Sequence, residues 1–361
     1  MDDELRLKGH GWIVHRLAAV PTPAGRTLLA SGDTEGTVRL WDPTTGEAVA
    51  RPLTLDETVV QSLAALRLAS GTQALVTSAP RGIALWDPAR LGDGPPLRHF
   101  AAPHALALAV VPATAGRPES LVTADAQQVR VIDPNTGSVL FRCKQPEGRR
   151  GHVGAGVHRL TGVRITDRTA GFAAIRYGGA VELWYPRARG RGWAMRQLDP
   201  GRRARGAMEY FTGLRDEPRL ALGSVRGIEV WDLRTGRLML DGDFAHGPCT
   251  ALAAVPLARR TVLAAAFGTD RDAGVQLWDP EAGRELGPVL NRPGPAFGRT
   301  SWGGVAVHAV VALAGSDGAM RVASAGNDGT VRVSPAMSGL TPSKEGRKPS
   351  REGRRPSRDG R

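Results

Sequence analysis

The stretch Val38-Arg39-Leu40-Trp41-Asp42-Pro43, which ends at Gly46, carries the pattern that decides the fold. Its aliphatic residues alternate with other side chains, which is the period of a β-strand and not of a helix. The Asp-Pro and the later glycine are typical of a tight turn. Asp suits the first turn position, Pro presets φ at the second, and Gly suits the close. The segment therefore predicts a strand that ends in a turn.

The same strand-turn pattern occurs seven times along the 361 residues. Its tryptophan column falls at Trp41, Trp86, Ile132, Trp184, Trp231, Trp278 and Ser334, so that successive copies lie 45 to 56 residues apart. A repeat of this length indicates a solenoid or a propeller. The last copy is degenerate, because serine stands where the others have a large apolar residue.

Short apolar runs surround each copy of the pattern. Two of them precede it, such as His15–Val20 and Leu28–Ser31, and a further run follows the turn in six copies, such as Val139–Cys143. Four short strands make one blade, and a blade cannot bury both of its faces alone. Stacking the blades around a ring buries the faces and leaves no open sheet edge. We therefore predict an all-β, seven-bladed β-propeller with four antiparallel strands per blade in residues 1–340.

The two ends of the chain fit a closed ring. The seventh copy has no good fourth strand after Gly339, whereas Leu5-Arg6-Leu7-Lys8 has the pattern of an outer strand. We expect this N-terminal segment to complete the seventh blade and to close the ring.

Residues 341–361 differ in composition from the rest of the chain. They are rich in Arg, Pro, Ser and Gly, they contain no apolar residue, and from Lys344 onward they contribute +5 of the formal net charge of +13. A segment without apolar side chains cannot form a core, so we expect a disordered basic tail. Such a tail can bind an anionic surface, and a solvated tail without a partner is the equal alternative.

The Trp-Asp dipeptides, together with Gly9-His10 and Gly151-His152, resemble the WD-repeat β-propeller family over residues 5–340. The resemblance implies a protein-interaction scaffold without a cofactor. It also implies a hydrogen-bond network of His, Ser or Thr, Asp and Trp within a blade. The first blade comes nearest to it, with His10, Ser31, Asp33 or Glu35, and Trp41, as the candidates. The other blades match this network poorly, so we expect packing to stabilise them.

Signatures of catalysis and of metal binding are absent from the sequence. There is no Walker-type phosphate loop, no His-Glu-x-x-His, no Gly-x-Ser-x-Gly and no Cys-x-x-Cys. Cys143 and Cys249 have no partner at metal-ligand spacing, and we interpret both as small core residues. We predict no enzyme, no cofactor and no metal site. An enzyme that uses the central channel of the propeller is the alternative, and it would need catalytic groups from several blades.

The loops that enter the first strand of each blade share one face of a propeller, called the top face here, with the turns between the second and third strands. Arginines cluster in these loops and turns in the fourth and fifth blades, and tryptophans outside the repeat lie in loops of the same class. The candidate binding residues are Arg149, Arg150, Arg176, Arg202, Arg203, Arg226, Trp12 and Trp302. Arginine favours carboxylate partners. A solvated basic rim, and tryptophans tucked under their own loops, are the alternatives.

The periodic tryptophans are predicted to be structural, because their spacing follows the blades: Trp41, Trp86, Trp184, Trp231 and Trp278. The function we predict is a monomeric, non-catalytic protein-interaction scaffold, either free-standing or the sensor or adaptor part of a larger system. Its partners would be proteins with an acidic surface. A nucleic-acid binder is the less favoured alternative, because only 5 % of residues are aromatic and the arginine-rich loops contain none. No apolar run reaches the ~20 residues of a membrane span. The acidic N-terminus does not resemble a signal peptide, so we expect a cytoplasmic location.

Overall fold

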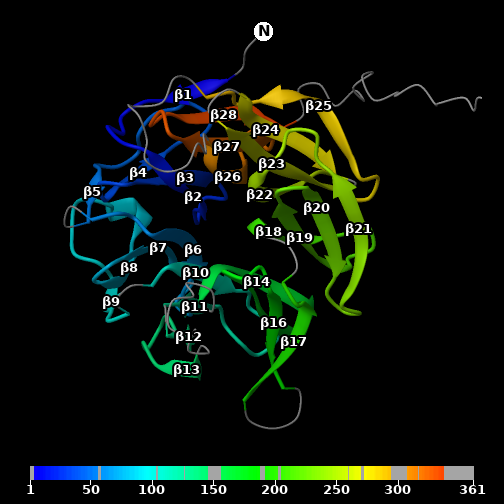
Figure 1. The fold of residues 1–361 in the computed structure, drawn as a ribbon. Helices are drawn as coiled ribbons and strands as arrows, with labels where there is room; N and C mark the ends of the chain where they lie inside the picture. Colours follow the sequence, from blue (N-terminus) through cyan, green and yellow to red (C-terminus); the bar gives the residue numbers. More distant parts are fainter. Residues whose placement is uncertain are drawn as a thin grey trace, which may run out of the picture.

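The computed structural model shows a ring of seven four-stranded antiparallel sheets (Figure 1), as the sequence predicted. It describes residues 4–55, 58–102, 105–125, 127–144, 156–187, 192–201, 205–258, 260–269, 272–293, 307–315 and 317–336. Within these ranges the one helical segment is a single 3-10 turn, Pro88–Arg90. No helix in this part of the chain is long and apolar enough to cross a membrane.

Blades one to six each use four strands that follow one another in sequence, and the innermost strands of the blades surround the centre of the ring (Figure 1). Blades one to three are β2 Val14–Pro21, β3 Thr27–Asp33, β4 Thr37–Trp41, β5 Leu53–Thr54; β6 Ser62–Arg67, β7 Gln73–Ala79, β8 Gly82–Trp86, β9 Arg98–Phe100; and β10 Ala107–Val111, β11 Ser120–Ala124, β12 Gln128–Ile132, β13 Val139–Lys144. Blades four and five are β14 Val157–Thr166, β15 Thr169–Arg176, β16 Val181–Pro186, β17 Trp193–Asp199; and β18 Arg205–Thr212, β19 Pro218–Ser224, β20 Gly227–Asp232, β21 Arg237–Asp243. Blade six is β22 Cys249–Pro256, β23 Thr261–Thr269, β24 Asp272–Asp279 and β25 Arg284–Leu290, and blade seven contains β26 Val307–Ala314, β27 Met320–Gly326 and β28 Val331–Pro335.

The N-terminal strand closes the ring, which confirms the prediction from the two chain ends. Strand β1, Leu5–Leu7, pairs antiparallel with β28 and is the fourth strand of blade seven. Leu5 lies opposite Val333 and Leu7 opposite Val331. The Leu7 side chain is 2 % exposed and packs with residues of blades one and seven. The first and last blades are thus joined by both backbone pairing and apolar burial. The predicted basic tail, residues 341–361, lies outside the described residues.

The apolar core lies between blades and is divided into seven clusters. The large residue at the end of the third strand packs against the preceding blade: Trp86 joins the cluster built by blade one, Trp231 that of blade four, and the fully buried Trp278 that of blade five. Trp41 of blade one packs in the same way with Leu313 and other residues of blade seven, so the first and last blades are also in contact. Each blade therefore depends on its neighbour for the burial of one face.

Blade one contains the complete hydrogen-bond network that the sequence suggested. The ring of His10 contacts the Asp33 carboxylate at 2.8 Å and the Ser31 hydroxyl at 2.7 Å. The Trp41 indole N–H donates to the same hydroxyl at 2.8 Å. All four side chains are buried. Of the two candidate acids, Asp33 is the one that takes part, and Glu35 only donates its backbone N–H to that carboxylate.

Blades four and five use a different network that the sequence analysis did not foresee. The Trp184 indole donates to Glu182 at 3.0 Å, and the Trp231 indole donates to Glu229 at 3.1 Å. An arginine then clamps each glutamate from the top face: Arg176 bonds Glu182 at 2.7 and 3.0 Å, and Arg205 bonds Glu229 at 2.8 and 3.1 Å. A buried carboxylate between an indole and a guanidinium replaces the histidine and serine of blade one.

The two cysteines have different surroundings. Cys249 is buried, as predicted, and burial raises the pKa of its thiol to about 12. Cys143 lies on β13, the outermost strand of its blade, where exposed and partly buried residues alternate. Its interpretation as a core residue is therefore wrong, because an apolar run on an outer strand has a neighbouring strand on one side only.

Ring closure can be tested by deleting residues 1–9. Loss of β1 leaves an unpaired edge on β28 and removes the buried Leu7, so the melting temperature should fall markedly. Deletion of residues 341–361 is the matched control and should leave the melting temperature unchanged. Equal melting temperatures for the intact chain and the N-terminal deletion would contradict the role of β1.

Replacement of Trp231 by alanine tests the packing between blades. The indole is buried against blade four and donates to Glu229, so unfolding free energy should fall by about 3–5 kcal/mol. Trp12→Ala is the control, because that side chain is 55 % exposed. Denaturant melts of both variants give the comparison, and an unchanged midpoint for Trp231→Ala would refute the packing role.

Candidate functional site

The top face carries the residues predicted to bind a partner, and the structure describes three of them. Trp12 precedes β2 and is exposed, so it is not tucked under its own loop. Arg226 is exposed in the turn between β19 and β20, beside the exposed Val225. Arg176 is engaged with Glu182 and is largely buried. The other five predicted residues, Arg149, Arg150, Arg202, Arg203 and Trp302, lie outside the described residues, so the predicted arginine sector stays a prediction.

A regular distortion occurs where the innermost strands begin at the top face. In β2, β14, β18, β22 and β26 the pairing with the second strand shifts by one residue, as in a β-bulge. The extra residues are His15, His158, Gly206, Thr250 and His308. A bulge bends the strand and changes the direction of nearby side chains, and bulges are common beside functional sites. Here they occur around the mouth of the central channel.

Two arginines follow the bulged histidines of blades one and four, which lie on opposite sides of the seven-membered ring. Arg16 donates to the backbone oxygens of Gln61 at 2.6 Å and His15 at 2.8 Å. Arg159 donates to the backbone oxygen of Gly206 at 3.0 Å. Neither guanidinium forms an ion pair with a carboxylate of the described chain. By contrast, Arg205, which borders the same mouth, is neutralised by Glu229 and Asp199.

Three histidines complete the set of residues that we call the channel collar, namely His15, Arg16, His158, Arg159 and His308. His158 stacks on Tyr177 with ring centroids 4.9 Å apart, and His308 contacts the Asn327 side chain at 2.6 Å. The Nδ1 atoms of His15 and His158 are buried and have no hydrogen-bond partner within the described chain. The collar therefore offers polar groups that the protein itself leaves unpaired.

The electrostatics of the collar follow from burial and from like charges. Burial, with smaller contributions from nearby Arg16 and His308, lowers the pKa of His15 to about 3. Burial also lowers the pKa of Arg16 to about 9, with Arg159 contributing. Burial and then Arg159 lower the pKa of His158. At neutral pH the histidines are neutral and the two arginines carry the charge.

Acidic residues are nearly absent from the innermost strands. Glu209 on β18 is the one acid among the seven innermost strands as described, and it lies further from the top face. Burial raises its pKa to about 7, although the backbone N–H of Ala254 donates to it. The channel wall thus has an excess of positive charge at its top end.

A cleft of about 350 Å³ opens at this mouth and is bordered by Arg159, Arg205, Thr250 and His308. It is large enough for a few side chains and far too small for a folded domain. No group of three or more potential metal ligands occurs in the part of the chain that the structure describes. The arrangement can hold an anion by charge and by hydrogen bonds.

The collar was not predicted from the sequence, although a signal was present. The dipeptide His-Arg occurs at the start of the first strand in both blade one, at 15–16, and blade four, at 158–159. Each pair lies within a run that was interpreted only as a strand. Their meeting at one mouth depends on ring closure, which joins positions more than a hundred residues apart.

Comparison with known proteins gives one family match. The model of the family described as WD domain, G-beta repeat, matches residues 3–42, which span β1 to β4 and include the network of His10, Ser31, Asp33 and Trp41. No curated protein matches the chain.

The pKa of His15 gives a prediction for the dependence of stability on pH. The folded value of about 3 lies below the ordinary 6.5, so the unfolded chain takes up the proton first as pH falls. The contribution of His15 is therefore complete above pH 6.5 and is lost progressively toward pH 3. Denaturant melts across this range should show less loss for His15→Gln than for the native chain. An imidazole of His15 that titrates near 6.5 by NMR would contradict the burial argument.

Proposed function

Because the chain is a WD-repeat β-propeller, we propose that it is a non-catalytic interaction platform that holds an acidic segment of a partner protein in the channel collar. WD-repeat propellers typically bind other proteins. We propose in addition where on the ring the partner segment binds, and that this segment is acidic.

The observation that carries the proposal is the pair Arg16 and Arg159. Both side chains are partly buried in the channel mouth, and within the described chain both donate to backbone oxygens. The charge of Arg159 also lowers the pKa of Arg16. A nearby anion stabilises a cation strongly in such a place, because the low local dielectric strengthens the attraction between the two charges. A carboxylate also accepts the paired bonds that a guanidinium offers.

The size of the mouth supports a projecting segment and not a flat protein surface. A cleft of about 350 Å³ admits one or two acidic side chains from a loop or a chain end. Around it, exposed Trp12 and Arg226 could contact the flanks of that segment. We propose that Arg149, Arg150, Arg202, Arg203 and Trp302, which enter neighbouring blades, extend this rim.

The test uses a fluorescently labelled oligoglutamate peptide and the double variant Arg16→Gln, Arg159→Gln. Both substitutions keep hydrogen-bond donors and remove the charge, so affinity should fall by about tenfold or more, and the salt dependence of binding should decrease. Arg168→Gln is the control, because Arg168 is exposed in the hairpin turn between β14 and β15 at the opposite end of the blade. Melting curves establish that all variants remain folded.

Three outcomes would overturn the proposal. Equal affinity of the native chain and the double variant for the peptide would show that the peptide does not bind at Arg16 and Arg159. Equal loss in Arg168→Gln would indicate a non-specific charge effect. Stronger binding of a single-stranded oligonucleotide than of the peptide, with the same dependence on Arg16 and Arg159, would indicate a nucleic-acid binder.

A further inference from the structure

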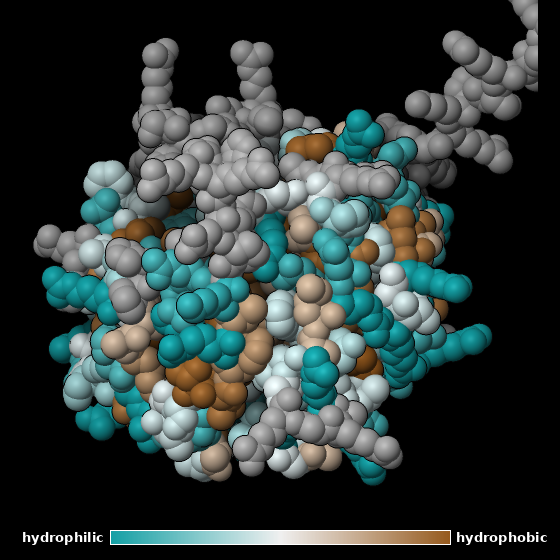
Figure 2. Space-filling model, turned by 60° about the horizontal axis from the view of Figure 1, so that its bottom comes forward, coloured by the Kyte–Doolittle hydropathy of each residue, from teal (hydrophilic) through white to brown (hydrophobic). Residues whose placement is uncertain are grey.

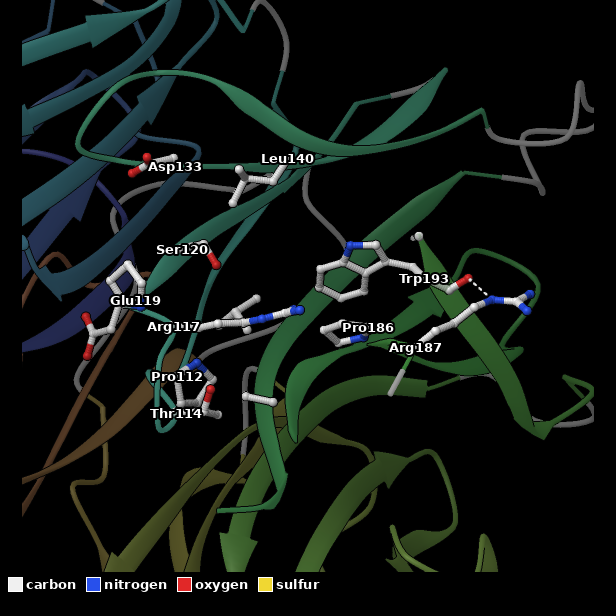
Figure 3. Close-up of a pocket in the computed structure, with 14 residues that line it drawn as sticks. Pro112, Thr114, Arg117, Glu119, Ser120, Asp133, Leu140, Pro186, Arg187 and Trp193 are labelled. Atoms are coloured by element: carbon white, nitrogen blue, oxygen red, sulfur yellow. Dashed lines mark hydrogen bonds between the residues drawn. The ribbon is translucent and has the colours of Figure 1, made fainter. Parts of the chain in front are cut away.

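A second hollow lies on the bottom face, between blades three and four. Its volume is about 630 Å³, and its walls come from the β10–β11 connection, the start of β13 and the paired ends of β16 and β17 (Figure 3). This is the end of the blades opposite the channel collar. We call it the blade 3–4 groove. Its size suits several side chains of an extended segment.

Apolar side chains form most of the wall. Trp193 stacks on Phe141 of blade three with ring centroids 5.1 Å apart, and packs on Phe172 of blade four at 5.6 Å. Its ring is therefore held in one orientation while it remains partly exposed. Leu140, which is 58 % exposed, and Pro112, Pro118 and Pro186 line the same hollow. A fixed aromatic ring beside an exposed leucine is typical of an anchor for a partner.

The outer strands around this region also expose apolar residues. Val139 and Leu140 on β13, Met195 on β17, and Leu238 and Met239 on β21 are all exposed. Figure 2 shows brown apolar patches on this side of the molecule, within a surface that is otherwise largely hydrophilic. The outer strands of blades three to five thus expose further apolar side chains beyond those that line the groove.

The acidic and the basic side chains of the groove differ in their interactions with the rest of the protein. Its carboxylates already serve the protein: Glu119 accepts from the backbone N–H of Arg67 at 2.6 Å, and Asp133 accepts from Asn135 and Thr136 in its turn. Its two arginines, Arg117 and Arg187, form no ion pair within the described chain. In Figure 3 the side chain of Arg117 extends toward Trp193 and Pro186. The charge available to a ligand is therefore positive.

We propose that the blade 3–4 groove binds a short extended segment of a partner protein in which a large apolar side chain is followed or preceded closely by Asp or Glu. The apolar side chain would pack on Trp193 and Leu140, and the carboxylate would meet Arg117 at the centre or Arg187 at the rim. The chain's own basic C-terminal tail is a poor occupant, because eight of its residues from 344 to 361 are Lys or Arg. The site does not depend on the collar, so the ring would hold two partners, one on each face.

The test is a selection of phage-displayed random dodecapeptides on the intact protein, followed by affinity measurements with the enriched peptides as labelled synthetic probes. We expect the enriched peptides to share a Trp, Phe, Leu or Met within two positions of Asp or Glu. Their affinity should fall by about tenfold or more in the double variant with Arg117→Glu and Arg187→Glu. It should fall equally in the single variant Leu140→Glu, which changes an exposed residue and leaves the core intact. Arg215→Glu, in an exposed turn of blade five, is the control for charge reversal outside the groove and should bind normally.

The collar variant Arg16→Gln, Arg159→Gln distinguishes this proposal from the proposed function. Peptides that lose affinity in the groove variants and not in the collar variant support the groove, whatever the collar binds. Enriched peptides that are basic, or that bind the groove variants and the native chain equally, would overturn the proposal. So would peptides whose binding depends only on the collar, or a selection that enriches no peptide sensitive to the groove variants.

Discussion

The structure depends on one constraint, which is that no blade can bury both of its faces alone. Most blades therefore present a large residue at the end of the third strand to the blade before them, as Trp86 and Trp278 do, and Trp41 packs against the last blade. The constraint can be met at every blade only if the ring is closed, and β1 closes it by pairing with β28. Where Ser334 replaces the tryptophan, Asn291 from blade six fills the interface and bonds Ser334 at 2.6 Å. The interface between blades six and seven is therefore filled although blade seven lacks the tryptophan.

Closure also creates the candidate site. Arg16 and Arg159 are distant in sequence and belong to opposite blades, and only the ring brings their charges to one mouth. Each charge is costly there because burial removes water, and Arg159 also repels the charge of Arg16. The bulges in the innermost strands place the neighbouring histidines at the same level. The packing energy between blades, and not the collar itself, keeps these groups together, which leaves them unpaired and available to an anion.

Much of the fold could be predicted from the sequence, because the signals are local and repeated. The alternation before Trp41 and the Asp-Pro-x-x-Gly turn after it define a strand and its end wherever they recur, and the missing strand after Gly339 indicated where β1 belongs. The site was less accessible to sequence analysis. Glu182 and Glu229 look like solvent-facing positions of a strand, and only the structure shows that an indole and an arginine enclose them. Cys143 was misassigned because an apolar run does not reveal whether its strand is inner or outer.

The central claim is that Arg16 and Arg159 hold a carboxylate in the channel mouth. The most direct measurement is an NMR titration of the arginine Nε–H signals with the oligoglutamate peptide. The account predicts that the Nε signals of Arg16 and Arg159 shift together, with the same binding curve, while that of Arg168 stays unchanged. Shifts confined to exposed arginines such as Arg168, with those of Arg16 and Arg159 unchanged at saturation, would contradict it.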